Sequence, residues 1–386
     1  MFQIQTMNKI SPAGLDRFDR AKYTWGDEMT APDAIMVRSA ALHDMEFPAS
    51  LKAIARAGAG VNNIPVDRCT EQGIVVFNTP GANANAVKEM VILALLMSSR
   101  KVAASMEWVK TLKGSGAEVS KLVEKGKSQF TGPEIAGKKL GVIGLGAIGI
   151  LVANAAEALG MTVYGYDPYI SVDAAWGLSQ SIIHASSLKE IYENCDYITL
   201  HVPANKETKG SINASSIAMM KPGVRIINFA RGELVETADL LAALDEKQVK
   251  VYITDFPADE MLDHPGVVAF PHLGASTPES EDNCARMAAQ ELIDFLESGN
   301  IKNSVNLPNA SMAKTPLPRI CVIHKNVKTI ISQISAALAD MNIENMLNKS
   351  KGDYAYTMLD VDRAVPAAAL DAVNAVDGVI RAFVIE

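Results

Sequence analysis

The chain has 386 residues, more than one hydrophobic core usually organises, so we expect two or three domains. Hydrophobic residues make up 48% and charged residues 21%, which is an ordinary composition for a globular protein in water. The formal net charge of −8 argues against nucleic acid or an anionic membrane as the main partner. It leaves room for a small anionic ligand, because a few local Arg or Lys side chains outweigh a distant field.

The cysteines and the N-terminus predict a cytoplasmic protein. Cys69, Cys195, Cys284 and Cys321 form no Cys-x-x-Cys pair and fit no zinc pattern, so we expect reduced thiols and no metal. The first residues, MFQIQTMNKIS, lack the basic start and apolar run of a signal peptide. The richest apolar stretch, residues 91–97, is far below the roughly 20 residues of a membrane span.

Two successive regions predict parallel sheets. In the first, residues 34–39, 52–58 and 73–78 are apolar throughout, which is typical of buried parallel strands with crossover helices between them. Residues 79–100 then predict a loop that opens into a long buried helix. The second region predicts a doubly wound sheet of about six strands and a final amphipathic helix over 279–298; its strands are expected at 138–143, 161–168, 196–203, 224–231, 249–256 and 267–276.

The last part of the chain predicts a smaller unit. Residues 299–319 are rich in Asn, Ser and Pro and predict a linker. The remainder follows the order βαββαβ, a ferredoxin-like plan with a hairpin turn near Lys351 and Gly352. The predicted fold class is therefore α/β, with two Rossmann-like doubly wound parallel-sheet domains and a C-terminal ferredoxin-like domain.

A glycine-rich motif predicts a dinucleotide site. Gly144, Gly146 and Gly149 form G-x-G-x-x-G between an apolar strand and the start of a helix. There the glycines let the backbone approach a pyrophosphate, and the helix N-terminus supplies N–H groups. Asp167, at the end of the next strand, would accept a hydrogen bond from the ribose 2′-hydroxyl of NAD and repel the 2′-phosphate of NADP. A purely structural glycine turn is the alternative.

Three further strand ends carry an arginine, carboxylates and a histidine. Arg231, the acidic stretch 255–260 and His272 should gather at the carboxyl edge of the same sheet. This set suits hydride transfer from a 2-hydroxy acid, because Arg binds a carboxylate through two hydrogen bonds and His accepts the hydroxyl proton. A carboxylate bonded to the far ring nitrogen would orient the His and raise its pKa.

Several segments in this order resemble the D-isomer-specific 2-hydroxyacid dehydrogenases. The resemblance runs in the family's order over about four fifths of the chain, and the segments that carry it are 56–64, 77–89, 137–149, 201–208, 227–235 and 270–277. The resemblance implies two α/β domains with an active site in the cleft between them. It implies a discontinuous substrate-binding domain at 1–98 and 285–318, an NAD-binding domain at 99–284, and a C-terminal domain at 319–386.

The resemblance also assigns roles to residues. It makes Arg231 the carboxylate binder and His272 the acid/base, and it places the cofactor against Ile148, Gly149, Pro203, Phe229 and Ala230. The acidic partner depends on the alignment. Aligning on Asp255 gives Glu260 that role and leaves Asp255 to contact the nicotinamide amide, whereas aligning on Phe256 gives Asp259 the role. We favour Glu260, because one deletion then accounts for both acidic residues.

The substrate is predicted from an early arginine and from the C-terminal unit. Arg38 and Ser39 resemble the Arg-Ser segment that binds substrate in family members acting on D-3-phosphoglycerate; Gly58 and Arg56 follow at the next strand end. A surface ion pair is the alternative for Arg38. Other D-2-hydroxy acids, such as glycerate, hydroxypyruvate or 2-hydroxyglutarate, remain alternative substrates, and a non-catalytic NAD sensor is the alternative class.

The C-terminal unit resembles an ACT domain, an effector-binding module. His324, Asn326 and Asn342 match the residues that bind L-serine between paired ACT domains, although Lys328 and Thr329 replace the usual Pro-Gly. The alternative is a unit that only pairs subunits. The resemblance implies a homodimer or homotetramer.

Overall fold

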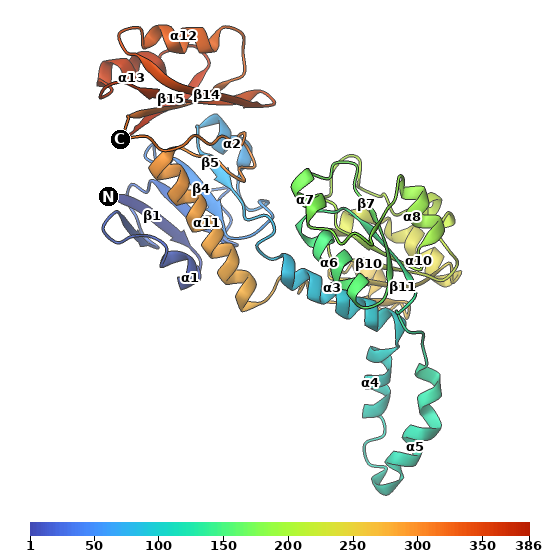
Figure 1. Cartoon of the computed structure of the whole chain (residues 1–386). Coiled ribbons are helices and arrows are strands. Elements are labelled where there is room, and N and C mark those ends of the chain that lie inside the picture. The colour runs from blue at the N-terminus through green and yellow to red at the C-terminus, as the bar shows by residue number, and fades with distance from the viewer. The chain divides into compact units, whose positions relative to one another are not determined.

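The structure is a computed structural model that describes residues 1–386. The chain divides into two compact units, one formed by Met1–Asn83 and Pro278–Glu386, the other by Ala84–Thr277 (Figure 1). The first unit holds a five-stranded parallel sheet and a four-stranded antiparallel sheet; the second holds a seven-stranded parallel sheet. The predicted fold class is confirmed. The boundaries of the three predicted domains stay a prediction. The second unit begins at Ala84, the first residue of a helix that ends at Ser99, whereas the predicted domain boundary lies at residues 98 and 99.

The five-stranded sheet contains the three strands predicted from apolar runs. Its order is β2-β1-β3-β4-β5, with β1 at Phe2–Met7, β2 at Tyr23–Gly26, β3 at Ala34–Val37, β4 at Ala53–Arg56 and β5 at Val75–Phe77. Strands β3 and β5 are buried along their whole length, which explains their continuous apolar sequence. Strand β1 is only half-buried and carries Gln3 and Gln5. It has no apolar run and was therefore not predicted from the sequence. Short helices α1 (Pro12–Leu15) and α2 (Val66–Glu71) complete this region.

The seven-stranded sheet has the order β12-β11-β10-β9-β6-β7-β8. Its strands are β6 (Lys139–Ile143), β7 (Thr162–Tyr166), β8 (Ile183–His184), β9 (Tyr197–Leu200), β10 (Val224–Asn228), β11 (Val249–Thr254) and β12 (Val267–Ala269). Helices α3 (Ala84–Ser99), α6 (Ala147–Ala158), α7 (Val172–Trp176), α8 (Leu188–Asn194), α9 (Ala214–Ala218) and α10 (Thr237–Asp245) belong to the same unit. The strand order reverses between β6 and β9, and ligands of open α/β sheets bind at such a switch point.

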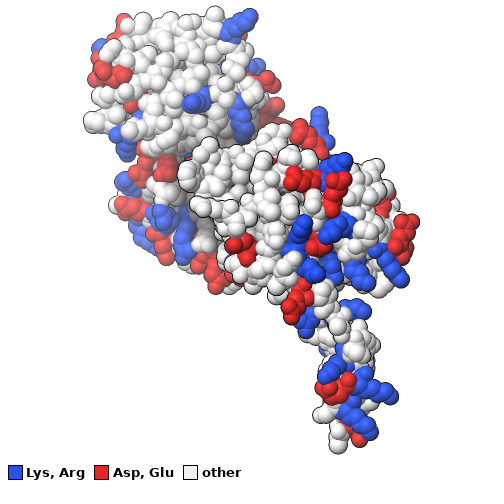
Figure 2. All heavy atoms as spheres, turned by 45° about the vertical axis from the view of Figure 1, so that its right-hand side comes forward, with Lys and Arg blue, Asp and Glu red and all other residues white.

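A helical hairpin projects from the second unit and was not predicted from the sequence. It comprises α4 (Val102–Lys110) and α5 (Val119–Gly126), and neither helix has a buried residue (Figure 1). Lysines and glutamates cover it together (Figure 2), and Lys110 and Lys121 each pair with a glutamate one turn away. Apolar residues of α4, Val102, Met106 and Val109, recur at helical spacing although they are exposed, so the sequence held a helical pattern that the sequence analysis did not identify. No helix of the structure is long and apolar enough to span a bilayer.

The C-terminal sheet has the predicted βαββαβ order. Strands β13 (Arg319–Lys325), β14 (Ile343–Lys351), β15 (Tyr354–Val361) and β16 (Val379–Ile385) pair antiparallel in the order β14-β15-β13-β16, with helices α12 (Ile330–Ala337) and α13 (Ala367–Asn374). Ile320 and Val322 pack with these helices, whereas Cys321 and Ile323 belong to the same core as helix α11 (Pro278–Ser298). Both faces of the C-terminal sheet are therefore covered.

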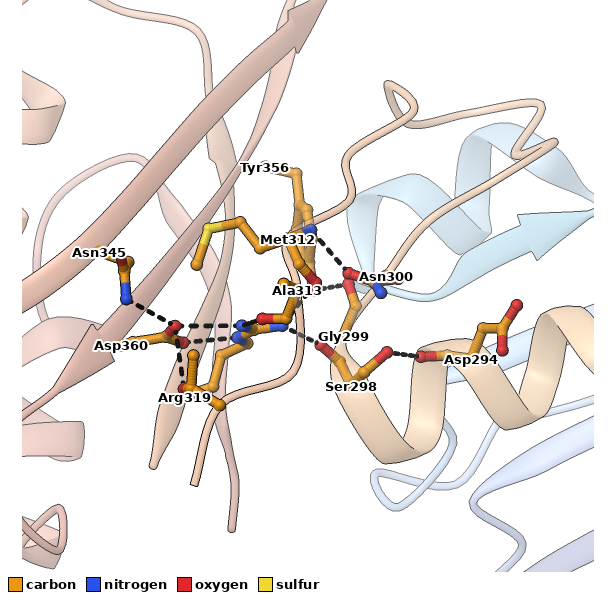
Figure 3. A network of polar contacts seen from close by, with 11 residues as sticks. Asp294, Ser298, Gly299, Asn300, Met312, Ala313, Arg319, Asn345, Tyr356 and Asp360 are labelled. Atoms are coloured by element: carbon orange, nitrogen blue, oxygen red, sulfur yellow. Dashed lines mark hydrogen bonds and ion pairs between the residues drawn. The ribbon is translucent and has the colours of Figure 1, made fainter. Parts of the chain in front are cut away.

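A buried ion pair fixes the C-terminal sheet to the end of α11 (Figure 3). The Arg319 guanidinium donates to both carboxylate oxygens of Asp360, at 2.6 and 3.1 Å, and the two side chains are 4% and 1% exposed. The same guanidinium donates to the carbonyl oxygens of Ser298 and Ala313, at 2.8 and 2.7 Å. Arg319 thus satisfies a carbonyl of the last turn of α11, which has no partner within the helix.

We expect Arg319→Ala to lower the free energy of unfolding by about 3–5 kcal/mol, because the Asp360 charge would remain buried without a partner. Denaturant unfolding followed by circular dichroism measures this change. Arg363→Ala is the matched control, since it breaks a more exposed pair with Asp362 in the same domain and should change stability by less than about 1 kcal/mol. Equal effects of the two substitutions would contradict the importance of the buried pair.

Glu291 is a buried acid on α11 with one unsatisfied oxygen. Its side chain accepts a hydrogen bond from the Asn303 amide at 2.7 Å, while Oε2 is buried without a partner. Burial raises the pKa of this carboxyl from 4.5 to about 8, although the hydrogen bond from Asn303 acts to lower it. The folded state therefore favours the protonated form, and stability falls as the pH rises from about 4.5 toward 8.

We expect Glu291→Gln to be more stable than the parent at pH 9, with the difference shrinking toward pH 5. Thermal melts across this range measure the difference. Glu297→Gln is the opposite control: burial acts to raise the pKa of Glu297, but hydrogen bonds from Lys22 and Tyr23 bring it below its ordinary value. This second substitution should destabilise the protein at neutral pH, and its effect should fade in acid. A Glu291→Gln difference that is flat with pH would contradict the raised pKa.

Candidate active site

The predicted glycine motif forms a tight turn between β6 and α6 at the switch point of the seven-stranded sheet. Gly144 has a φ of 94°, and a Cβ there would lie 2.6 Å from the carbonyl oxygen of His201 after β9. At Gly149 a Cβ would lie 1.9 Å from the carbonyl oxygen of Gly144. Gly146 instead faces open space. The turn itself therefore requires Gly144 and Gly149, whereas the absence of a side chain at Gly146 leaves open space on the outside of the turn.

The end of this turn fits a dinucleotide. Gly146 is the N-cap of α6 and provides no side-chain hydrogen bond, so the first backbone N–H groups of this 12-residue helix have no side-chain cap. Asp167 follows β7 and accepts hydrogen bonds from the backbone of Leu145 at 2.8 Å and Tyr169 at 2.9 Å. The predicted acid thus lies directly against the glycine turn, where the ribose of a bound dinucleotide would be recognised.

Arg231 lies just beyond β10 and is held there through its backbone. The buried Asn228 side chain accepts hydrogen bonds from the N–H groups of Ala230 and Arg231, and donates to the carbonyl oxygen of Arg231 at 2.8 Å. Its amide also donates to the Tyr252 hydroxyl at 3.1 Å. The Arg231 side chain itself is exposed. Asn228 positions Arg231, a role that the sequence analysis did not predict. The available signal was that Asn228 is the last residue of the strand, three positions before Arg231.

His272 occupies a strained position beyond β12. Its φ is 49°, a left-handed conformation that costs a non-glycine residue about 1–3 kcal/mol when it is imposed. Two contacts with Asp255 impose it: His272 donates its N–H to the Asp255 carbonyl oxygen at 3.1 Å, and Gly274 donates to Asp255 Oδ2 at 2.9 Å. The exposed imidazole lies 4.7 Å from the Phe256 ring, measured between centroids.

Asp255 is buried and incompletely satisfied. It is 1% exposed, and its Oδ1 has no hydrogen-bond partner. Burial raises the pKa of this carboxyl, while the Gly274 N–H acts to lower it. An unpartnered buried acceptor at the same edge of the sheet as the dinucleotide turn fits the amide group of a nicotinamide. The residues present therefore fit NAD.

The structure gives no carboxylate on the His272 ring. Asp259 and Glu260 lie in a short 3₁₀ turn, Asp259–Met261; both are exposed, and neither forms a hydrogen bond or ion pair with His272. A cavity of about 610 Å³ is lined by His272 together with Asp255 and Glu233. The choice between Glu260 and Asp259 as the acidic partner stays a prediction.

The remaining predicted cofactor residues belong to the same sheet. Phe229 is buried and its ring lies 6.1 Å from that of Phe270. Ala230 follows it at the end of β10, and Ile148 lies in the first turn of α6. Pro203 is exposed beyond β9, where its carbonyl oxygen accepts a hydrogen bond from Thr208. These positions agree with a role at the carboxyl edge, and their contacts with a cofactor stay predictions.

The predicted substrate residues lie in the first unit, beyond β3 and β4. The Asn8 side chain accepts hydrogen bonds from the N–H groups of Ser39 and Ala40, which fixes the loop after β3. The Arg56 guanidinium donates to the carbonyl oxygens of Arg38, at 3.0 Å, and Gly60. Arg56 therefore holds two loops together. Arg38 itself is exposed and forms an ion pair with Glu281 at 2.6 Å.

Gly58 lies where the backbone folds back on Arg56. A Cβ at Gly58 would lie 3.1 Å from the Arg56 guanidinium, and its carbonyl oxygen accepts from Thr79 at 3.1 Å. In the C-terminal unit, His324 is buried with its Nδ1 against the Lys325 carbonyl oxygen and its Nε2 against the Thr357 hydroxyl, both at 2.8 Å. Asn326 and Asn342 are exposed. Two of the three predicted effector residues are thus accessible.

Residues 92–274 match the family model described as D-isomer specific 2-hydroxyacid dehydrogenase, NAD binding domain. These residues therefore belong to the NAD-binding domain of this family. Its similarity to D-3-phosphoglycerate dehydrogenase of Bacillus subtilis is 33% identity over 88% of this chain and 65% of the relative. The human enzyme of that name is 34% identical over 69% of this chain and 48% of its own length. The chain thus spans about half to two thirds of the length of these relatives.

Solved structures of dehydrogenases share the fold. An NAD⁺-bound 3-phosphoglycerate dehydrogenase from Entamoeba histolytica superposes with a TM-score of 0.61, 27% identity, and coverage of 79% of this chain and 98% of that one. A glyoxylate/hydroxypyruvate reductase from Sinorhizobium meliloti superposes with a TM-score of 0.65 over 79% and 98% of the two chains, at 22% identity. The match to an NAD-binding domain and the similarity to the NAD⁺-bound structure from Entamoeba histolytica support NAD as the cofactor.

The two kinds of glycine in the motif should respond differently to substitution. Gly149→Ala forces a Cβ against a carbonyl oxygen and should destabilise the protein by about 1–3 kcal/mol. Gly146→Ala meets no protein atom, so the melting temperature should stay unchanged while NAD binding weakens, since a pyrophosphate must approach this backbone. Thermal melts and calorimetric titration with NAD measure the two effects. Unchanged NAD affinity in Gly146→Ala would contradict the site.

Proposed function

We propose that the protein is an NAD-dependent dehydrogenase that oxidises D-3-phosphoglycerate to 3-phosphohydroxypyruvate, the first step of serine biosynthesis. The observation that carries the proposal is the arrangement of Arg231, Asp255 and His272 at the ends of the neighbouring strands β10, β11 and β12. A protein that only bound the dinucleotide would have no need of an exposed arginine and an exposed histidine at this edge. The non-catalytic NAD sensor is therefore the weaker alternative.

Each residue of this set has a separate task. The Arg231 guanidinium binds the substrate carboxylate through two hydrogen bonds and orients the carbon that is oxidised. The His272 imidazole accepts the proton of the 2-hydroxyl group as that carbon loses its hydride. Bound NAD⁺ supplies the acceptor for the hydride. Glu260, or alternatively Asp259, stabilises the imidazolium that results, and Asp255 holds the His272 loop while its free oxygen accepts from the nicotinamide amide.

The phosphate is assigned to the first unit. Arg38 is an exposed cation on a fixed loop, and the next residue, Ser39, offers a hydroxyl group, a combination suited to a phosphate monoester. Two comparisons favour this substrate: relatives at 33–36% identity carry the name D-3-phosphoglycerate dehydrogenase, and so does a structural neighbour. Glycerate, hydroxypyruvate and 2-hydroxyglutarate are the alternative substrates. A homodimer or homotetramer in the cytoplasm is the proposed setting.

The C-terminal domain is proposed to be an ACT domain that binds L-serine. Its βαββαβ order supports this assignment, and Asn326 and Asn342 are exposed. His324 supports it less, because both ring nitrogens have partners within the chain. A role confined to subunit pairing is the alternative.

The test is NADH formation from NAD⁺ with D-3-phosphoglycerate, D-glycerate and 2-hydroxyglutarate, each with and without L-serine. We expect turnover with phosphoglycerate that serine suppresses. Arg231→Ala should lower kcat/KM by about 10²-fold or more, since one bidentate charge-assisted contact is lost. Turnover confined to another hydroxy acid would move the assignment to that substrate, and no turnover with any of them would favour the sensor.

The acidic partner is distinguished in the same assay. Of Glu260→Gln and Asp259→Asn, the substitution that lowers the pKa seen in the pH–rate profile of kcat/KM marks the carboxylate acting on His272. An unaltered profile in both variants would exclude both residues.

A further inference from the structure

The ion pair on Arg38 links the substrate loop to the first turn of α11. Arg38 Nη2 lies 2.6 Å from Glu281 Oε1, and the two side chains are 44% and 43% exposed. The residues are 243 positions apart in the chain, so the fold brings them together. Both belong to the first unit, and neither is needed for its core.

The neighbouring charges have other partners. Asp282, the next acidic residue on α11, accepts from the Ser11 hydroxyl and pairs with Arg286 at 3.7 Å. The Arg56 guanidinium donates to backbone oxygens of the two loops. Glu281 is thus the carboxylate paired with Arg38, whose loop is already fixed by Asn8. A cation held in place and neutralised by its own chain attracts an anion less strongly than a free one.

We propose that Glu281 is an affinity-setting residue for the substrate: it competes with the distal phosphate for Arg38. This inference rests on the proposed function, in which Arg38 binds that phosphate. A ligand that reaches Arg38 must displace the carboxylate and then lie beside its negative charge. The cost of lying beside Glu281 grows with the negative charge of the ligand. It is therefore greatest for a phosphate, which carries about −1.5 to −2 at neutral pH, and absent for a hydroxymethyl group.

The same competition acts on the product. 3-Phosphohydroxypyruvate keeps the phosphate of the substrate, so a carboxylate waiting beside Arg38 also favours its departure. Product release limits kcat in many enzymes. Glu281 therefore raises KM without contributing to the chemical step. It weakens the binding of the substrate and speeds the release of the product.

The test compares Glu281→Gln with Glu279→Gln, which removes the same charge two residues away in the first turn of α11. Binding of D-3-phosphoglycerate is measured by calorimetry, and turnover is measured separately. We expect Glu281→Gln to tighten binding and lower KM roughly two- to fivefold, the range expected for losing an exposed ion pair. Glu279→Gln should change both by less, and D-glycerate should respond to neither substitution.

A double-mutant cycle with Arg38→Ala completes the test. In the Arg38→Ala background the effect of Glu281→Gln should shrink, because no cation remains for which to compete. Equal binding in the parent, Glu281→Gln and Glu279→Gln would overturn the inference, and so would an effect that survives in full without Arg38. Tighter binding without NADH formation would support the affinity-setting role and contradict only the proposed reaction.

Discussion

Every candidate residue of the dehydrogenase site depends on one constraint: in a parallel sheet, the carboxyl ends of all strands lie along the same edge. Gly144, Asp167, Arg231, Asp255 and His272 each follow a different strand of the seven-stranded sheet. Residues separated by more than a hundred positions therefore share one edge without any contact having to be specified by neighbouring sequence. The reversal of strand order between β6 and β9 opens that edge, and Gly144, the first glycine of the motif, lies there against the carbonyl oxygen of His201.

Helix α11 plays the corresponding role in the first unit. Its buried face, which includes Ala288, Leu292 and Phe295, belongs to a core shared by the five-stranded sheet and the C-terminal sheet. Its first turn carries Glu281 against Arg38, and its last turn gives a carbonyl oxygen to Arg319. With 21 residues it is about 30 Å long. One helix therefore joins the proposed phosphate site to the C-terminal domain, and Arg319, held by Asp360, bonds the end of that helix to the C-terminal sheet.

The sequence predicted those elements whose burial imposes a pattern. Strands β3 and β5 are buried along their length and appear as apolar runs. The βαββαβ order could be predicted because β13 and β15 are also almost entirely buried and apolar, and the helices bury one apolar face. Strand β1 was missed because it is only half-buried and has no apolar run. The hairpin of α4 and α5 was missed although apolar residues recur there at helical spacing, because they are exposed and form no part of a core. Motifs likewise predicted the kinds of site residue, but not their partners. Three such contacts depend on segments distant in sequence. Arg56 donates to a backbone oxygen of another loop, His324 bonds to Thr357, and Glu281 pairs with Arg38.

Asp255 illustrates how the site combines strain and incomplete bonding. One of its oxygens and its carbonyl group hold the loop in which His272 adopts a left-handed conformation, so the carboxylate must stay in place for the imidazole to face the cavity. Its other oxygen is buried without a partner, and burial raises the pKa of the group. A hydrogen-bond donor placed at Oδ1 would favour the ionised form and remove the cost of the unpartnered acceptor. An amide N–H₂ supplies such a donor and no charge, whereas the hydrogen bonds that Asp255 makes in this loop come from the backbone N–H groups of His272 and Gly274 and none comes from the His272 ring. Because Asp255 holds the loop and leaves Oδ1 for the nicotinamide amide, we seek the acidic partner of His272 in the 3₁₀ turn at Asp259–Met261.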